Sequence, residues 1–140
     1  MAMSGVEMYR RELLKGSTET LILSLLALES MYGYMLVKEI DSRSSGYFHL
    51  KEGTIYPALH RLERDKLVES SWWEECPGGQ TRRYYKITSR GRERLHSLIQ
   101  EWDLFTSAVN LIASPPDKLT NGASRNGTVP TALTPLPSEA

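Results

Sequence analysis

The sequence lacks several features that would define its class directly. It contains a single cysteine, Cys76, which excludes a disulfide framework and a thiolate metal cluster. No apolar run approaches the roughly 18 residues that a membrane span needs. The apolar stretch 21–28 is interrupted by Ser24, and no small-residue cleavage site follows it. We therefore expect a cytoplasmic protein with no membrane segment and no secretory signal.

Patterns typical of enzymes are also missing. The three histidines, His49, His60 and His96, do not have the spacing of metal ligands, and the cysteine has no obvious histidine partner. The pair Gly78-Gly79 lacks the lysine and the following helix of a phosphate-binding loop. The sequence thus predicts no enzyme, no cofactor and no metal.

The formal net charge is zero, which argues mildly against nucleic-acid binding, but the charges are unevenly distributed. Residues 82–94 contain six basic residues and one acid, Glu93, a local balance of +5. Acids elsewhere, such as Glu74 and Glu75, cancel this excess. By charge alone, the basic stretch fits a solvated strand and helix start as well as a phosphate-binding patch.

Hydrophobic periodicity predicts three helices in the first half of the chain. Ser17 is suited to cap the first, whose apolar residues 21–28 we place at the centre of the core. A second helix is expected over about 34–42, and residues 47–50 fit a short strand. The third helix is expected from about Glu52 to Lys66.

The third predicted helix has two different faces. Ile55, Leu59 and Leu62 form one buried stripe. Pro57 is expected in the first turn or so, where its missing N–H is tolerated. The face opposite the stripe lacks carboxylates, since Glu63 and Asp65 fall to its sides. The residues on this face and its shoulders are Gly53, Thr54, Tyr56, Pro57, His60, Arg61 and Arg64.

Two strand-like runs, 67–74 and 82–88, flank a Pro-Gly-Gly turn and predict a β-hairpin with a long tip. Trp72 and Trp73 are adjacent on a strand and must point to opposite faces. We expect one of them in the core, and the other exposed or against the last helix. Cys76 near the tip is either incidental or an oxidation switch.

A last helix, capped by Thr88 or Ser89, is expected to reach about Ala113. Its apolar residues are spaced 3-4-3-4-3, a heptad seam that calls for a partner helix. The seam residues are Leu95, Leu98, Trp102, Phe105, Val109 and Ile112. Residues 114–140 are rich in proline and poor in large apolar residues, so we predict a disordered tail.

Together these elements predict a mainly α fold with a small β-hairpin, a winged helix-turn-helix followed by a C-terminal dimerisation helix. We expect an N-terminal arm (1–16), a winged helix (17–88), a dimerisation helix (89–113) and the tail (114–140). In such a fold the third helix enters the DNA major groove and the hairpin, the wing, lies along the phosphate backbone. Wing residues suited to phosphate contact are Gly79, Gln80, Arg82 and Arg83.

Several segments resemble the PadR family of bacterial transcriptional regulators. The resemblance rests on Tyr32-Gly33-Tyr34, on the run from Glu52 to Glu63, and on the run from Arg83 to Arg92, with Leu13–Ser17 similar to the usual opening. It covers about residues 10–113 and is closest to the subgroup with a single C-terminal helix. It implies a homodimeric repressor that binds a double-stranded DNA operator and is released by a small molecule or another signal.

The resemblance also implies roles for individual residues. Thr54, Tyr56 and Arg61 match positions of the DNA-reading helix, with the Tyr56 hydroxyl on a phosphate, and Lys15 and Tyr34 match positions near the backbone. The alternative for the two tyrosines is core packing, and for Arg61 an ion pair with Asp65, four residues on.

Two features depart from the family pattern. Lys66 stands where the family commonly has a glycine, so this turn is either rearranged or adds a positive charge near DNA. The tail has no family counterpart.

Trp102 lies in the middle of the seam, where two copies would face each other in a dimer. Some short PadR regulators resemble multidrug sensors that bind flat aromatic ligands between paired tryptophans. Trp102 is therefore a candidate effector site for flat hydrophobic cations or phenols, and the alternative is plain dimer packing. For the whole chain, the alternative to a DNA-binding regulator is a winged-helix module that binds proteins and no DNA.

Overall fold

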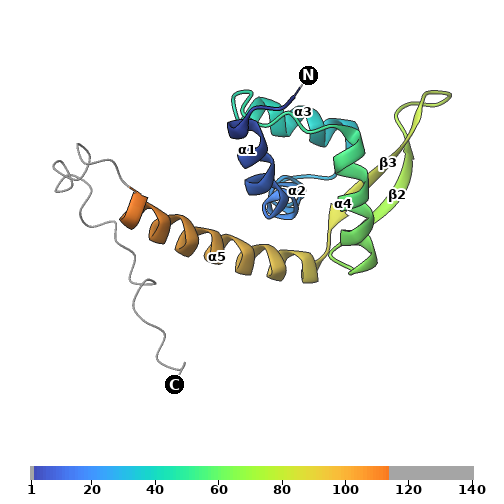
Figure 1. Ribbon diagram of the computed structural model, residues 1–140. Coiled ribbons are helices and arrows are strands. Elements are labelled where there is room, and N and C mark those ends of the chain that lie inside the picture. Colours follow the sequence, from blue (N-terminus) through green and yellow to red (C-terminus); the bar gives the residue numbers. More distant parts are fainter. Residues whose placement is uncertain (1, 114–140) are drawn as a thin grey trace. The chain divides into compact units, whose positions relative to one another are not determined.

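The computed structural model describes residues 2–113, which form helices and a small antiparallel sheet (Figure 1). The chain divides into two compact units, residues 1–96 and residues 97–140. In chain order the elements are α1 (Gly5–Lys15), α2 (Thr18–Leu26), β1 (Met31–Tyr32), α3 (Gly33–Arg43), α4 (Glu52–Arg64), β2 (Val68–Glu74), β3 (Thr81–Ile87) and α5 (Ser89–Ala113). From α2 onward the helices and the hairpin follow the predicted order, a winged helix-turn-helix followed by a long helix. The predicted tail, 114–140, lies outside the described residues.

Helix α2 supplies the centre of the core in the first unit. Ile22 and Leu23 are fully buried, together with Leu36 of α3 and Ile55 of α4. Burying each such side chain contributes roughly 1.5–3 kcal/mol to stability. The apolar run 21–28 therefore forms the core helix that the sequence predicts.

The predicted N-terminal arm contains a helix, α1, that the sequence analysis did not anticipate. The Ser4 hydroxyl accepts a hydrogen bond from the Glu7 N–H (3.1 Å), and the Glu7 carboxylate accepts one from the Ser4 N–H (3.3 Å). This reciprocal capping box starts the helix. No residue of α1 is buried, so no apolar face in the sequence signalled it. Ser17 stands at the N-cap of α2, but its hydroxyl donates to the Leu13 carbonyl instead of capping.

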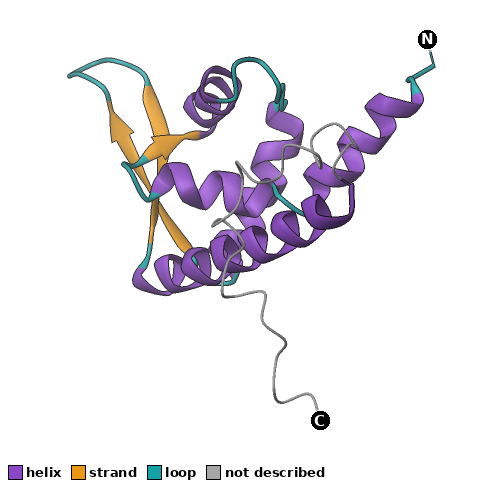
Figure 2. Ribbon diagram, turned by 90° about the vertical axis from the view of Figure 1, so that its left-hand side faces the viewer, coloured by secondary structure: helices purple, strands orange, loops and turns teal. Residues whose placement is uncertain are grey.

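The sheet has the strand order β1-β3-β2, and both neighbouring pairs are antiparallel (Figure 2). The predicted hairpin forms: Val68 pairs with Ile87 in the core, and Trp72 pairs with Arg83 further out. The third strand was not predicted and lies at residues 31–32, directly before α3.

Long-range contacts account for this extra strand. The Met31 side chain is buried, and the Tyr32 ring meets the Tyr84 ring edge-on with 5.3 Å between centroids. Two residues are too few to show the alternation of apolar and polar side chains that marks a strand, so β1 is recognised only by its pairing with β3.

The strand expected at residues 47–50 does not form. Ser45 and Gly46, just before it, have φ angles of 54° and 80°, in the left-handed region. These residues end α3 in a turn, and no strand of the described sheet pairs with residues 47–50, so the segment 44–51 is the loop between α3 and α4.

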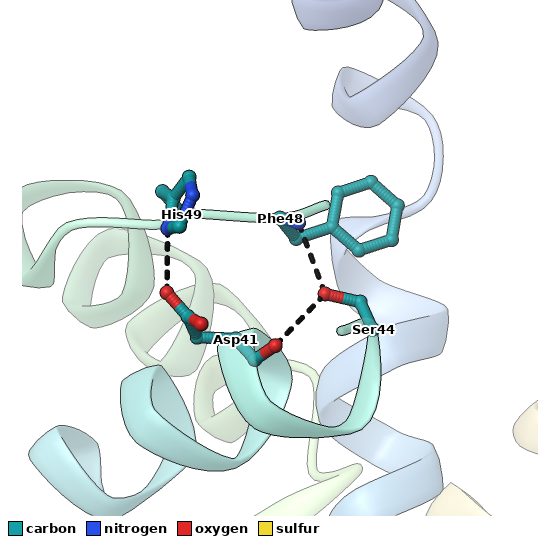
Figure 3. Close-up of polar contacts among 4 residues, drawn as sticks. All are labelled: Asp41, Ser44, Phe48 and His49. Atoms are coloured by element: carbon teal, nitrogen blue, oxygen red, sulfur yellow. Dashed lines mark hydrogen bonds and ion pairs between the residues drawn. The ribbon is translucent and has the colours of Figure 1, made fainter. Parts of the chain in front are cut away.

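Side-chain contacts hold this loop to the end of α3 (Figure 3). The Ser44 hydroxyl donates to the Asp41 carbonyl (3.2 Å) and accepts from the Phe48 N–H (3.0 Å). His49 Nδ1 lies 2.5 Å from a carboxylate oxygen of Asp41. These contacts fix the point from which α4 starts.

Pro57 lies in the second turn of α4, slightly deeper than predicted. The N–H that proline lacks would have bonded the carbonyl of Gly53. Gly53 is exposed, so water can bond that carbonyl, and the helix continues to Arg64.

The end of α4 is a Schellman motif. The Leu67 N–H donates to the Leu62 carbonyl (2.9 Å), and the Lys66 N–H donates to the Glu63 carbonyl (3.0 Å). Lys66 itself has a φ of 65°. The turn is therefore not rearranged: a lysine adopts the left-handed conformation that glycine takes most easily.

The wing and α5 meet the end of α4 at Thr88. Its hydroxyl donates to the Lys66 carbonyl (2.8 Å) and accepts from the Gly91 N–H (3.0 Å), so Thr88 caps α5 as predicted. Its own N–H donates to the Leu67 carbonyl. A Cβ at Gly91 would collide with that same carbonyl oxygen, so the first turn of α5 lies directly against the end of α4.

Neither wing tryptophan belongs to the core. Trp72 and Trp73 are 65% and 61% exposed, so the prediction that one of them is buried is wrong. The hairpin extends away from the helices toward its tip (Figure 1), and both indoles keep most of their surface in solvent. The Trp73 Nε1–H donates to Ser71, whereas Trp72 lies beside the Arg83 guanidinium.

Candidate nucleic-acid interface

Helix α4 has the two faces that the sequence predicts. Ile55, Leu59 and Leu62 are buried against the core. Polar and cationic residues occupy the exposed side of the helix, namely Thr54, His60, Arg61 and Arg64, together with Gly53 and Pro57. A rigid helix thus presents a row of donors to solvent.

The acidic residues near this face are occupied elsewhere. Glu63 turns toward the wing, and Asp65 lies at the C-cap, 3.4 Å from Arg64. The alternative ion pair of Arg61 with Asp65 is not present, and in the described part of the chain Arg61 has no ion-pair partner. Arg61 is therefore the cation of this face that is freest to bind a ligand.

Arg83 joins the wing to α4. Its Nε donates to the Ser70 hydroxyl (2.9 Å) and its Nη2 donates to Glu63 (3.3 Å), while Ser70 donates to the other oxygen of Glu63 (2.6 Å). The three side chains thus form a closed hydrogen-bonded ring. Arg83, for which the sequence predicts a phosphate contact, thus also links the wing to α4.

The other wing arginine, Arg82, lies over an aromatic ring. Its guanidinium is 4.2 Å from the centroid of Tyr32, its Nε is 3.0 Å from Glu75, and its Nη2 donates to Gln80 (3.2 Å). The Nε contact is an ion pair without hydrogen-bond geometry. Arg82 is thus already partly neutralised at the base of the wing tip.

A tight turn forms the tip of the wing. The Gly79 N–H donates to the Cys76 carbonyl (2.6 Å), and Gly78 has a φ of 80° after Pro77, which fits a type II turn. A Cβ at Gly79 would collide with the Cys76 sulfur. The glycines are therefore needed for the turn itself, and Gln80 follows it as an exposed residue.

A hollow of about 370 Å³ separates α4 from the wing. It is lined by Tyr32, Tyr34, Glu52, Tyr56, His60, Trp72, Gln80, Thr81, Arg82, Arg83 and Tyr85. The structure thus gathers most of the predicted site residues of α3, α4 and the wing around one surface. Thr54, Arg61, Arg64 and Gly79 do not line it, and neither does Lys15, which lies on α1, paired with Glu12 at 3.0 Å.

The two predicted tyrosines differ in environment. Tyr34 is half-exposed, with Lys38 5.5 Å from its ring centroid, so it is not a core residue. The ring of Tyr56 lies against Gly33, where any Cβ would collide with it. Burial, reinforced by Glu52, raises the pKa of Tyr56 above its usual value, so the hydroxyl keeps its proton and can donate a hydrogen bond at neutral pH.

The sequence analysis missed the positioning roles of Glu63 and Tyr32. Glu63 and Arg83 are far apart in the chain, and no local pattern links them. The strand alternation places Arg82 and Tyr84 on one face of β3, but only the pairing of β1 with β3 brings Tyr32 to them.

The seam of α5 is largely exposed in this single chain. Leu95 is buried, whereas Trp102, Phe105, Val109 and Ile112 are between 41% and 88% exposed. The Trp102 and Phe105 rings lie 6.4 Å apart, centroid to centroid. From Trp102 to Ile112 the seam thus exposes much of its apolar surface within the described part of the chain.

The described part of the chain contains neither a metal-binding cluster nor a helix suited to span a membrane. Among residues 2–113, no three His, Cys, Asp or Glu side chains are placed to hold a metal ion. No described helix is both long and apolar enough to cross a membrane.

The three-helix core, the exposed polar face of α4 and the adjacent hairpin define a winged helix-turn-helix protein. The chain belongs to the PadR family: residues 22–97 match the family described as "Transcriptional regulator PadR-like family". The predicted absence of enzymatic activity agrees with this membership, since the family consists of regulators and not of enzymes.

Individual relatives agree with the family assignment. The chain is 36% identical over 95 residues to protein X of Lysinibacillus sphaericus, covering 68% of this chain and 86% of that protein. A solved transcriptional regulator from Clostridium thermocellum is 32% identical, with a TM-score of 0.68, covering 74% of this chain and 99% of that one. Bacillus subtilis PadR, solved with operator DNA, shares the fold at 21% identity and a TM-score of 0.53, covering 59% and 46% of the two chains.

Proposed function

We propose that this chain is a sequence-specific, DNA-binding transcriptional regulator that acts in the cytoplasm as a homodimer. The observation that carries the proposal is the exposed face of α4, where Thr54, His60 and Arg61 project from a rigid helix while Glu63 is withdrawn to Arg83. Hydrogen-bond donors without competing carboxylates suit a surface that meets base edges and phosphates.

Helix α4 enters the major groove in this proposal, and the wing follows the adjacent backbone. Arg61, His60 and Thr54 face the groove, Arg64 reaches a phosphate, and the protonated Tyr56 hydroxyl donates to another. Tyr34 and Lys15 lie near the backbone, and Gly79, Gln80 and Arg82 act from the wing. Bacillus subtilis PadR, a protein of the same fold, has been solved in complex with operator DNA, which supports DNA as the partner.

Dimerisation uses the uncovered seam of α5. A strict heptad seam is the pattern by which two helices pack together, and an exposed Trp102 and Phe105 are costly to leave in water. A two-fold dimer then places one α4 in each half of a roughly palindromic operator.

We further propose that the regulator is a repressor and that a flat aromatic effector binds at Trp102 and weakens DNA binding. Two exposed indoles that face each other across the seam would form an apolar slot for a planar ligand. Calorimetric titration of the free dimer with rhodamine 6G, a flat hydrophobic cation, tests this site. Trp102→Leu keeps the seam apolar and should lose the binding, and equal binding by this variant would refute the site.

A salt titration tests the DNA proposal itself. The probe is a mixed-sequence duplex of about 30 base pairs, roughly three helical turns. Each phosphate contact contributes about −0.9 to the slope of log affinity against log salt. We expect a steep slope for the wild type, and weaker binding with a shallower slope for Arg64→Ala, which removes the phosphate contact proposed for α4.

The matched control is Arg43→Ala, which removes an equal charge from an arginine already paired with Glu39 at 2.8 Å. It should leave the slope unchanged. If the wild type ignores duplex DNA even at low salt, the chain is instead the alternative, a winged-helix module that binds proteins.

A further inference from the structure

A second hollow lies beside the start of α4, away from the wing. Its volume is about 460 Å³, and it is bounded by α1, the α3–α4 loop and the first turn of α4. Its lining residues are Met3, Glu7, Arg10, Arg11, Leu14, Tyr47, Phe48, His49, Leu50, Lys51 and Thr54. None of the predicted site residues except Thr54 belongs to it.

The two arginines and the lysine of this hollow have no ion-pair partners within residues 2–113, whereas His49 lies against the Asp41 carboxylate. The Arg10 guanidinium lies over the Tyr47 ring at 4.4 Å, and Arg11 reaches only the Met3 sulfur at 3.6 Å. Lys51 is exposed and makes no ion pair in the described part. The one acid of the lining, Glu7, is bound to the backbone of Ser4 in the capping box of α1. With Arg10, Arg11 and Lys51 against the single lining carboxylate of Glu7, the hollow keeps an excess of positive charge.

This groove is continuous with the exposed face of α4, because Thr54 belongs to both. An arginine stacked on an aromatic ring keeps the N–H groups at its edge free for an anion. The stacking on Tyr47 also restricts the side chain, which lowers the entropy cost of binding a phosphate.

We propose that this groove, through Arg10 and Arg11 of α1 and Lys51, binds backbone phosphates of DNA that flank the bases met by α4. The inference rests on the proposed function and adds a second DNA-binding surface to it. Helix α1, which buries no residue in the core, thereby acquires a role as a backbone clamp. Such contacts fix position and supply affinity without reading sequence.

The test compares salt slopes on the same mixed-sequence duplex. We expect Arg10→Gln/Arg11→Gln to reduce the magnitude of the slope by about 0.9 for each phosphate that the variant no longer binds, summed over both protomers. The reduction should be the same on any duplex sequence, because no base is touched. Arg10→Lys/Arg11→Lys should restore most of the slope, which a purely structural role of the stacking would not predict.

Arg94→Gln/Arg43→Gln is the matched control, since both arginines are already paired, with Glu19 and with Glu39. If the double Gln variant loosens the fold, Arg11→Gln alone carries the test, because that side chain touches only Met3. A folded Arg10→Gln/Arg11→Gln variant with a wild-type slope overturns the clamp and leaves the α4 proposal intact. A wild type that does not bind DNA overturns both.

Discussion

Lys66 occupies a backbone conformation that is unfavourable for a residue with a Cβ atom. The Schellman motif after α4 needs a left-handed residue at this position, and the chain supplies a lysine with a φ of 65°. Outside glycine, this conformation costs roughly 1–2 kcal/mol because Cβ crowds the following carbonyl oxygen. The Lys66 side chain is exposed and makes no ion pair within residues 2–113, so nothing visible offsets the cost.

We therefore expect Lys66→Gly to stabilise the protein by about 0.5–1 kcal/mol, after allowing for the greater freedom of glycine in the unfolded chain. Thermal unfolding followed by circular dichroism should show a Tm higher by several degrees. Lys66→Ala removes the same charge but keeps Cβ, and should give no such gain. An equal rise in both variants would show that the charge, and not the backbone, is responsible.

The ring of Arg83, Ser70 and Glu63 is a second feature at the scale of single residues. The side chains of Arg83 and Glu63 are 40% and 31% exposed, so solvent screens much of their attraction. We expect a coupling of about 0.5–1 kcal/mol between Arg83→Ala and Glu63→Ala in a double-mutant cycle. Urea unfolding measures it, because urea adds no ions.

The control cycle uses Lys15 and Glu12, which are equally close but more exposed, at 73% and 67%. Their coupling should be smaller. A coupling at Arg83–Glu63 no larger than at the control pair would mean that this ring does not hold the wing to α4.

Single-residue predictions succeeded where the sequence period determines the environment. The buried stripe of Ile55, Leu59 and Leu62 is confirmed, because helical spacing alone places these side chains on one face. The prediction that one wing tryptophan is buried is wrong, and the bonds of Arg83 to Ser70 and Glu63 were not predicted, because both depend on which residues lie opposite on another element. A local pattern carries no information about such partners.

At the scale of elements, strong periodicity predicted α2 to α5 and the hairpin correctly. It failed for α1, which begins on a capping box but buries nothing, and for β1, which is only two residues long. It also placed a strand at 47–50, where no strand of the described sheet lies alongside to pair with it. Elements that depend on tertiary contacts are not visible in a hydrophobic pattern.

The seam of α5 gives a prediction at this scale. Phe105→Lys places a charge in the middle of the apolar face and should convert the dimer to a monomer in sedimentation velocity experiments. Gln100→Lys, on the opposite side of the same helix, adds the same charge and should remain dimeric. A dimeric Phe105→Lys variant would show that α5 is not the main interface.

At the scale of the whole molecule, effector and operator compete through one dimer. Linkage requires that a ligand which weakens DNA binding is itself bound more weakly, by the same factor, when DNA is present. We expect rhodamine 6G and duplex DNA to lower each other's affinity by an equal factor, within the usual range of about 5–150-fold. Fluorescence anisotropy of labelled duplex and of the dye, with dye and duplex alone as blanks, measures both sides.

Unequal factors would mean that the dye acts on the DNA and not on the protein. No change in either affinity would leave Trp102 a packing residue of the dimer and would remove the effector from the proposal.

The junction at Thr88 connects α5, where the effector is proposed to bind, to α4, which is proposed to bind DNA. One hydroxyl group bonds the carbonyl at the exit of α4 and the amide at the entry of α5, and Gly91 leaves no gap between them. The end of α4 and the first turn of α5 are therefore held together by the Thr88 hydroxyl, so that a tilt of one helix moves the other. A small rotation at the start of α5 would change the direction in which α4 points.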